Sequence, residues 1–344
     1  MKMTGDGDLR QLPIIDIIRP NRVLYDRIAG MKCFVTGCAG FVGSHLTEAL
    51  LAADHEVLGV DSLIPFYDPE LKRQNLAAAL AHPRFRFAEI DLIEADLRPL
   101  LADVDVVFHI AGQPGVRDSW GEHFAGYTRN NVLSTERLLH AAAGTGVKRF
   151  VYAGSSSVYG DSPEMPWHED VCPRPRSPYA ITKLAAEHLC RSYRLDFGVP
   201  TVVVRYFTVY GPRQRPDMAF HKFLKAAMFD QPIPLYGNGR QTRDFTYVSD
   251  IVAGTIAAAS APDAVGGTFN LGGGSRIVLL DLLEMLADVV GKPVTIERRG
   301  QQAGDVRHTW ADISRSKQML GYQPRVGLEE GLRAEYAWIQ ERYE

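Results

Sequence analysis

The chain has 344 residues, of which 46% are hydrophobic and 23% charged, and its formal net charge is −3. This composition suits a globular protein with a sizeable core, and it offers neither the basic surface that nucleic acid needs nor the roughly 20-residue apolar run that spans a bilayer. The four cysteines lack the spacing of metal ligands or of a disulfide framework, so we expect a cytoplasmic protein without metal, membrane or nucleic-acid partners.

Short apolar runs alternate with helical stretches from Met31 onward, whereas residues 1–30 form an N-terminal extension whose role the sequence leaves open. Strands are expected at 32–36, 56–60, 85–90, 105–110, 149–154 and 201–207, with helices between them, such as 44–55 and 135–146. Continuous apolar runs are typical of strands that are buried on both faces. The alternation therefore predicts an α/β fold with a Rossmann-type, doubly wound parallel sheet.

Beyond residue 207 the alternation breaks, because 210–245 is rich in proline, arginine and glycine and contains one helical stretch. We expect the chain to return to the sheet with 250–259 and 268–273 and to leave it again for 276–344. The prediction is a smaller, discontinuous C-terminal lobe for the substrate, beside a cofactor-binding domain. The predicted bounds are 31–207 plus about 244–275 for the cofactor-binding domain, and about 208–243 plus 276–344 for the lobe.

A glycine-rich loop, TGCAGFVG, directly follows the first predicted strand. Glycines at 37, 40 and 43 allow a tight turn and let backbone amides approach a pyrophosphate at the start of the next helix. A glycine-rich turn that serves packing alone is the alternative, but the position between a strand and an amphipathic helix favours a dinucleotide site. The predicted contacts of this loop with the dinucleotide are Gly37, Gly40, Phe41, Val42 and Gly43.

The ends of the next strands carry further candidate cofactor residues. Asp61 ends the second strand, where a carboxylate can accept hydrogen bonds from an adenosine ribose and would repel a 2′-phosphate, which favours NAD over NADP. An ordinary turn aspartate is the alternative reading. Asp91 and Leu92 end the third strand and are expected to flank the adenine, and Ala111 lies in the small-residue end of the fourth strand. Their order along the sheet predicts an NAD site.

The segment SPYAITK places Tyr179 and Lys183 four residues apart, so the two side chains are neighbours on a helix. An isolated pair of this kind is usually a surface tyrosine beside a solvated lysine. Here a strand that runs into a cluster of three serines precedes it, and a hydroxyl in that cluster could reach both a substrate oxygen and the phenol, although turn chemistry is the usual role of such serines. Lowering a phenol pKa from about 10 to about 7 needs roughly 4 kcal/mol, which an ammonium and a positive nicotinamide ring could supply.

These blocks, followed by RYFTVYGPRQRPDM and GRQTRDFTYVSDI, resemble the extended short-chain dehydrogenase/reductases of the nucleotide-sugar epimerase and dehydratase type, from Met31 to the C-terminus. The resemblance implies Tyr179 as general base, Lys183 as its activator and Ser155 as a hydrogen-bond partner of the substrate hydroxyl. Related dehydratases and decarboxylases resemble a pattern with acidic residues before V-Y-G, where this chain has Ser156, a candidate substrate contact, and Ser157. The implied reaction is therefore 4-epimerisation through transient C4 oxidation, rotation of the 4-keto sugar and hydride return.

Two segments, 61–73 and 205–223, resemble the UDP-glucuronate 4-epimerases more than the UDP-glucose enzymes, which usually carry Asn where this chain has Thr208. Arg215 is implied to pair with the sugar carboxylate, for which a guanidinium fork is well suited, although a solvated loop arginine is the alternative.

Three further residues are candidate contacts of the nucleotide part of the substrate. Arg243 resembles the arginine that holds the UDP diphosphate, and Asp305 resembles the acid that binds the nucleotide ribose. Arg117 is an additional candidate for a carboxylate or phosphate contact. Gln302 stands where many hexose epimerases carry an arginine, so diphosphate binding is expected to be rearranged.

Three alternatives remain open on the sequence. One is an epimerase of UDP-glucose and UDP-galactose, or of an N-acetylhexosamine; the second is a non-catalytic NAD-binding member of the fold; the third is an oxidoreductase that releases NADH. The resemblance also implies a homodimer that forms through two helices per subunit, expected within 130–146 and 180–197.

Overall fold

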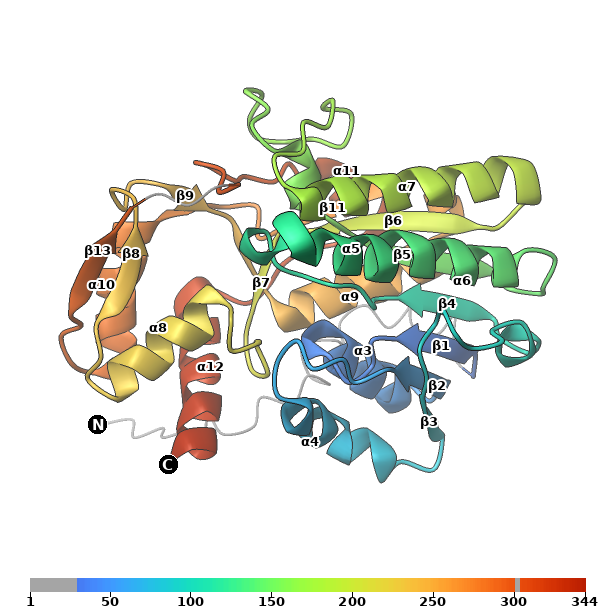
Figure 1. Ribbon diagram of the computed structural model, residues 1–344, viewed down its shortest axis with the longest axis horizontal. Helices are drawn as coiled ribbons and strands as arrows, with labels where there is room; N and C mark the ends of the chain where they lie inside the picture. The colour runs from blue at the N-terminus through green and yellow to red at the C-terminus, as the bar shows by residue number, and fades with distance from the viewer. Residues whose placement is uncertain (1–29, 301–303) are drawn as a thin grey trace, which may run out of the picture.

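The computed structural model describes residues 30–300 and 304–344, and its centre is a seven-stranded sheet in the order β11-β6-β5-β4-β1-β2-β3 (Figure 1). All neighbouring strands are parallel. The strands are β1 (Lys32–Thr36), β2 (Glu56–Asp61), β3 (Phe85–Glu89), β4 (Val106–His109), β5 (Arg149–Ser155), β6 (Thr201–Tyr206) and β11 (Thr268–Leu271). The doubly wound parallel sheet is confirmed, and its strand order reverses between β1 and β4, where such sheets bind ligands.

Alternate side chains of the central strands enter two different cores, one on each face of the sheet. Phe34 of β1 packs in the core beneath α6 (Ser134–Ala142) and α7 (Pro178–Phe197). Its neighbour Val35 packs in the core beneath α3 (Phe41–Ala52) and α9 (Val248–Ser260). A further helix, α4 (Pro69–Leu80), packs on α3. Both faces of the sheet are thus covered, which explains why its strands are apolar throughout.

One sheet prediction and the bounds of two predicted helices need correction. The segment 250–259, expected to return to the sheet, lies in α9, a helix that packs on β5 and β6; β11 alone brings this part of the chain back to the sheet. Helix α6 ends at Ala142 rather than near 146, because Ala143 has an extended backbone and Gly144 has φ +71°. The predicted helix 44–55 is α3, which begins earlier, directly after Gly40.

A second group of helices packs beside the sheet around a core of its own (Figure 1, left). It consists of α8 (Ala219–Met228), α10 (Leu279–Val290) and α12 (Leu328–Tyr343), together with the parallel strands β8 (Ile233–Tyr236) and β13 (Ile296–Arg299). This group is the smaller, discontinuous C-terminal lobe, since its elements come from two separated parts of the chain. The residue bounds of the two domains stay a prediction.

Short elements connect the sheet to this lobe. Strand β7 (Thr208–Tyr210) pairs with β10 (Phe245–Tyr247), and β9 (Thr242–Arg243) pairs with β12 (Ile277–Val278). The remaining helices are α5 (Phe124–Tyr127), which precedes α6, and α11 (Ser314–Leu320). In the part of the chain that the structure describes, no helix is both long and apolar enough to cross a membrane.

Leu286 of α10 lies fully buried in the core of the second helix group. We expect Leu286→Ala to lower the free energy of unfolding by about 2–5 kcal/mol, because it removes apolar contacts and leaves a cavity. The same substitution at Leu80, which is 56% exposed at the end of α4, is expected to change it by less than about 0.5 kcal/mol. Urea unfolding measures both. A loss at Leu286 no larger than at Leu80 would contradict the packing described here.

Candidate functional site

A cavity of about 450 Å³ opens where the carboxyl ends of the central strands meet. The loops after β1, β2, β4, β5 and β6 line it, together with the first turns of α7. The sequence-predicted site residues that line it are Gly37, Gly40, Phe41, Val42, Gly43, Asp61, Asp91, Leu92, Ala111, Ser155, Ser156, Tyr179, Lys183, Thr208 and Arg215. The structure therefore brings the predicted cofactor residues and the predicted reaction residues into one cavity.

The glycine turn is packed so closely that side chains do not fit. Gly37 has φ +71° and donates a hydrogen bond to the carbonyl of Val60 at 2.8 Å. A Cβ atom on Gly43 would lie 2.0 Å from the carbonyl oxygen of Gly37. Among the described residues no side chain caps the start of α3, and its first turn has no acidic residue. The helix therefore presents unsatisfied N–H groups at the cavity, as a pyrophosphate site requires.

Backbone hydrogen bonds fix the carboxylate of Asp61 at the end of β2. Oδ1 accepts from the N–H of Leu63 at 2.8 Å, and Oδ2 accepts from the N–H of Ala39 at 3.2 Å. The ammonium of Lys72, which the sequence analysis did not single out, lies 3.9 Å from Oδ1 and also donates to the carbonyl of Ile64. The carboxylate is thus held in place at the cavity wall with a cation beside it.

The carboxylate of Asp91 is also held by neighbouring groups. It accepts from the N–H of Ile93 at 2.8 Å and from Nη1 of Arg129 at 2.7 Å. Asp91, Leu92 and Ala111 line the same cavity as the glycine turn. The residues present therefore fit a dinucleotide that runs from β3 across the glycine turn to the end of β5.

Tyr179 and Lys183 lie one turn apart at the start of α7, as predicted. The helix begins there because Ser177 accepts a hydrogen bond from the N–H of Ala180 at 3.1 Å and Pro178 occupies the first helical position. Ser155 ends β5, and its Oγ accepts from the N–H of Ser157 at 3.2 Å. The three side chains converge on the cavity from two elements that the core beneath α7 holds together.

Burial governs the acidity of these groups. It raises the pKa of the Tyr179 phenol, while a hydrogen bond with Ser155 and the positive charge of Arg215 lower it. Burial lowers the pKa of Lys183 to about 8, against the opposing charge of Glu187. The Lys183 ammonium lies 4.5 Å from the centre of the Tyr152 ring. Arg215, which the sequence analysis had assigned to substrate binding alone, is thus one cation that lowers the pKa of the phenol.

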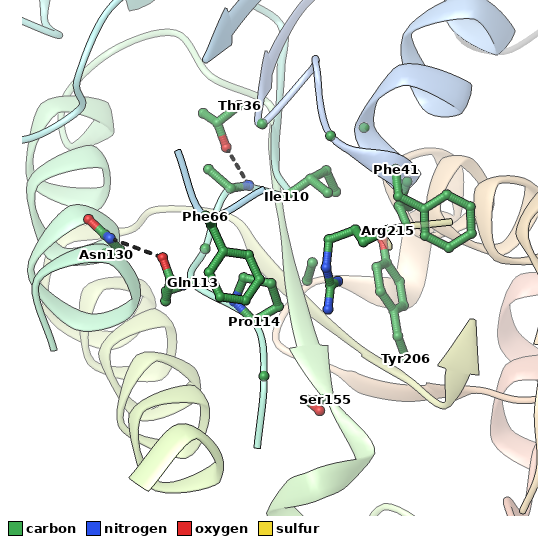
Figure 2. Close-up of a pocket in the computed structure, with 18 of the residues that line it drawn as sticks. Thr36, Phe41, Phe66, Ile110, Gln113, Pro114, Asn130, Ser155, Tyr206 and Arg215 are labelled. Carbon is green, nitrogen blue, oxygen red and sulfur yellow. Dashed lines mark hydrogen bonds between the residues drawn. The ribbon is translucent and has the colours of Figure 1, made fainter. Parts of the chain in front are cut away.

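Arg215 reaches into the cavity between Phe66 and Tyr206, above Ser155 at the strand end (Figure 2). Its side chain is 17% exposed and makes two hydrogen bonds to Asp217, each of 2.9 Å. The alternative of a solvated loop arginine therefore does not describe Arg215.

Residues that line or support the cavity wall without any motif include Thr36, which lines it, and Asn131, which lies behind it. Asn131, on a π-helical turn before α6, accepts from the N–H of Gln113 at 2.6 Å and donates to Thr182 of α7 at 3.0 Å. Thr36 accepts from the N–H of Ala111 at 3.1 Å and hydrogen-bonds the ring of His109. These contacts join β1, the loop after β4 and α7 around the cavity. They depend on residues that lie far apart in the sequence.

Arg117, Arg243 and Asp305 do not line this cavity but gather beside it. Arg117 forms an ion pair with Asp305 at 2.7 Å, and its guanidinium stacks on the ring of Tyr236 at 4.2 Å. Burial lowers the pKa of Arg243. The negative charge of Asp305 raises this pKa, and the positive charge of Arg117 lowers it further. Val116, which precedes Arg117, does line the cavity, so the cluster borders it. Gln302 lies outside the described residues.

Among the residues that the structure describes, neither the cluster nor the cavity has the side chains to hold a metal ion. Across residues 30–300 and 304–344, no group of three or more His, Cys, Asp or Glu side chains could hold one. His109, interpreted from the sequence as a packing residue, is fully buried, and burial lowers its pKa to about 3, with the charge of Lys183 adding to this.

Known proteins match this chain over most of its length. The profile of the NAD dependent epimerase/dehydratase family matches residues 33–272. Over 316 residues the chain is 40% identical to the UDP-glucuronate 4-epimerase of Thermodesulfobacterium geofontis, across 90% of this chain and 96% of that protein. It is 44% identical over 315 residues to a Bacillus subtilis protein named uncharacterized UDP-glucose epimerase YtcB, across 91% of this chain and 99% of that protein.

A solved structure adds a neighbour with bound molecules. The crystal structure of UDP-glucuronic acid 4-epimerase from Bacillus cereus, in complex with UDP-glucuronic acid and NAD, superposes with a TM-score of 0.89 at 44% identity. The match covers 91% of this chain and 100% of the Bacillus cereus chain.

The close packing of the glycine turn leads to a test of the dinucleotide site. We expect Gly43→Ala to weaken NAD binding about tenfold or more, equivalent to about 1.4 kcal/mol, because the added Cβ would displace the turn at Gly37. Calorimetry on nucleotide-free protein measures the dissociation constant. Gly126→Ala is the control, since a Cβ there meets nothing within 4 Å. Equal NAD affinities in the two variants would contradict the assignment.

Proposed function

We propose that this chain, which belongs to the NAD dependent epimerase/dehydratase family, is an NAD-dependent 4-epimerase that interconverts UDP-glucuronate and UDP-galacturonate. One observation carries the choice of substrate: the half-buried guanidinium of Arg215 points into the same cavity as Ser155 and Tyr179. A carboxylate on the sugar would give this cation a partner. Support also comes from the relatives of 40% and 44% identity that are named UDP-glucuronate 4-epimerases.

NAD, when bound, accepts a hydride from the sugar and gives it back. The N–H groups at the start of α3 and the turn at Gly37 are proposed to hold its pyrophosphate, and Asp61 its adenosine ribose. Asp91 and Leu92 would flank the adenine, and Ala111 would leave space beside the cofactor. Because the Asp61 carboxylate is already oriented by two backbone N–H groups, little reorganisation is needed for it to accept ribose hydroxyls.

Tyr179 is the proposed general base that takes the proton of the C4 hydroxyl, with Ser155 hydrogen-bonded to the same hydroxyl. The groups of the protein leave the phenol pKa above its ordinary value, so a phenolate at neutral pH needs more positive charge nearby. Lys183, whose pKa is about 8, is still largely protonated at pH 7 and would supply part of that charge. A nicotinamide ring would supply the rest.

The serine loop limits what can happen after oxidation. Ser156 and Ser157 begin the short helical turn after β5, so neither position offers a carboxylate to move a proton at C5. A 4-keto sugar in this cavity would therefore be expected to turn over and take the hydride on its other face. The result is inversion at C4 with no net redox change.

The UDP-sugar would lie from Arg215 to the neighbouring cluster. Thr208 and Arg215 are proposed to face the C6 carboxylate, and Arg243 and Asp305 the diphosphate and the nucleotide ribose. Arg117 now pairs with Asp305, so we propose that this ion pair opens when the ribose binds. Because Gln302 stands where many hexose epimerases carry an arginine, we expect the diphosphate to be bound differently here. The guanidinium of Arg117 is a candidate to replace the charge of that missing arginine.

We further propose a cytoplasmic homodimer that forms through the helices within 130–146 and 180–197. Large apolar side chains exposed on or beside them support this surface: Phe124, Leu133, Ile181, Leu195 and Phe197. The predicted division into a cofactor-binding domain and a substrate lobe is retained in this proposal.

Proton NMR of UDP-glucuronate incubated with the protein and a trace of NAD tests the function, with UDP-glucose in a parallel sample. The galacto-configured C1 signal is expected from UDP-glucuronate only. Conversion of UDP-glucose alone would favour the hexose epimerase alternative, and accumulation of NADH would favour a net oxidoreductase.

Tyr179→Phe is expected to lower the turnover of UDP-glucuronate by roughly 10²- to 10⁴-fold, because the general base is lost. Affinity for the UDP-sugar should change little, since the ring and its packing remain. Chromatographic assay of the product and calorimetry of the UDP-sugar measure the two quantities. Substantial turnover in this variant would rule out Tyr179 as the base.

Arg215→Met is expected to lower kcat/KM for UDP-glucuronate roughly 30-fold or more, since losing a charge-assisted pair costs about 2 kcal/mol or more. Arg213→Met is the matched control, because Arg213 lies in the same loop but pairs with Glu48 at 2.8 Å. Equal losses in both variants would show that the loop, and not the Arg215 charge, is what matters.

A further inference from the structure

The guanidinium of Arg215 already has an anionic partner within the protein. Nε donates to Oδ1 of Asp217 and Nη2 donates to Oδ2, both at 2.9 Å, so Asp217 covers one whole edge of the group. In the described parts of the chain Nη1 has no hydrogen-bond partner, which leaves it for a ligand. The proposed function gives Arg215 a role but none to Asp217, which does not line the cavity.

Asp217 carries a full negative charge beside the site. Burial would raise its pKa, but the charge and hydrogen bonds of Arg215 outweigh burial and keep the pKa below its ordinary value. Lys222 also acts on Asp217. The Arg215–Asp217 pair is therefore close to neutral as a unit, and a sugar carboxylate that enters the cavity would meet a cation that is already paired.

The other charged groups around the pair do not restore a free cation. Lys72 faces it from α4, but its ammonium lies 3.9 Å from Asp61. Tyr67, on the loop between β2 and α4, is near enough to be influenced by Arg215, Asp217 and Asp61. Lys72 and Arg215 are thus each close to a carboxylate, Asp61 and Asp217, and Lys222 is a further cation that acts on Asp217 rather than on the cavity.

A weakened cation suits the proposed reaction, on which this inference rests. The 4-keto sugar has to turn over between the two hydride transfers, so its C6 carboxylate cannot keep one position throughout the cycle. An arginine with no other partner would hold the ground state strongly and raise the barrier to rotation. It would also be left unpaired in a largely buried position each time the carboxylate moved away, which is costly.

We propose that Asp217 neutralises part of the charge of Arg215 and so sets how tightly UDP-glucuronate is held and how readily its sugar turns over. In this role Asp217 is a specificity-determining residue that acts through Arg215. Asp217 stays hydrogen-bonded to Nε and Nη2 and so keeps the guanidinium paired and oriented. The substrate carboxylate meanwhile binds, leaves and rebinds at Nη1.

The test is Asp217→Asn in the Tyr179→Phe background, where the substrate binds without turnover. Calorimetry would give dissociation constants for UDP-glucuronate, UDP-glucose and UDP. We expect UDP-glucuronate to bind roughly three- to tenfold more tightly, the range for a partly exposed charge, and the other two to be unchanged. With Tyr179 restored, both KM and kcat for UDP-glucuronate should fall, because only the ground state is held more tightly.

Two variants control for local structure. Glu48→Gln removes a carboxylate from the neighbouring Arg213 in the same way and should leave all three dissociation constants unchanged. Asp217→Glu keeps the charge and should behave like the parent protein.

Several outcomes would overturn the proposal. Weaker binding of UDP-glucuronate in Asp217→Asn would show that Asp217 only positions Arg215, and equal weakening of all three ligands would show that it only anchors the loop. If the parent protein converts UDP-glucuronate but Asp217→Asn leaves its affinity unchanged, this proposal fails alone. If the parent protein neither binds nor converts UDP-glucuronate, the proposed function fails and this inference with it.

Discussion

Parallel pairing of β1 with β2 on one side and with β4 on the other is the constraint on which the site depends. All the strands run the same way, so their loops emerge at one edge, and the loops after β1 and β4 leave on opposite faces of the sheet. A crevice results at that point. The glycine turn lines the bottom of this crevice and is closely packed, since a Cβ atom at Gly43 would lie 2.0 Å from the carbonyl oxygen of Gly37. The cofactor residues, the serine loop and the start of α7 all gather around this crevice.

Burial then sets the chemistry of the charged groups. It disfavours the phenolate of Tyr179 and the ammonium of Lys183, so each needs a compensating neighbour. For Lys183 that neighbour is Glu187, one turn further along α7, which is itself paired with Arg205 of β6 at 2.7 Å. For Tyr179 the neighbours are Ser155 at the end of β5, through a hydrogen bond, and Arg215, through its charge from a loop that belongs to neither element. The group that we propose to recognise the substrate therefore also acts on the proposed base.

The sheet could be predicted from the sequence because its strands are buried on both faces and read as continuous apolar runs. The same signal misled at 250–259: α9 is buried on almost every side, so its sequence lacks the polar face that marks a helix. The glycine turn and Asp61 could also be placed, since each lies at a fixed point in one strand–turn–helix unit. Asp217 and Lys72 could not, because their roles depend on how α4 and a distant loop meet. Likewise, no motif indicated that Arg117 and Asp305 form an ion pair, since the two residues lie far apart along the chain.

The central claim is that C4 is oxidised and reduced again within one closed cycle on UDP-glucuronate. UDP-glucuronate labelled with deuterium at C4 tests it directly when its conversion is followed by NMR. The account predicts a galacto-configured product that keeps deuterium at C4, since the same hydride returns to the other face of the sugar. A product that has lost the label to solvent, or no galacto-configured product at all, would contradict it.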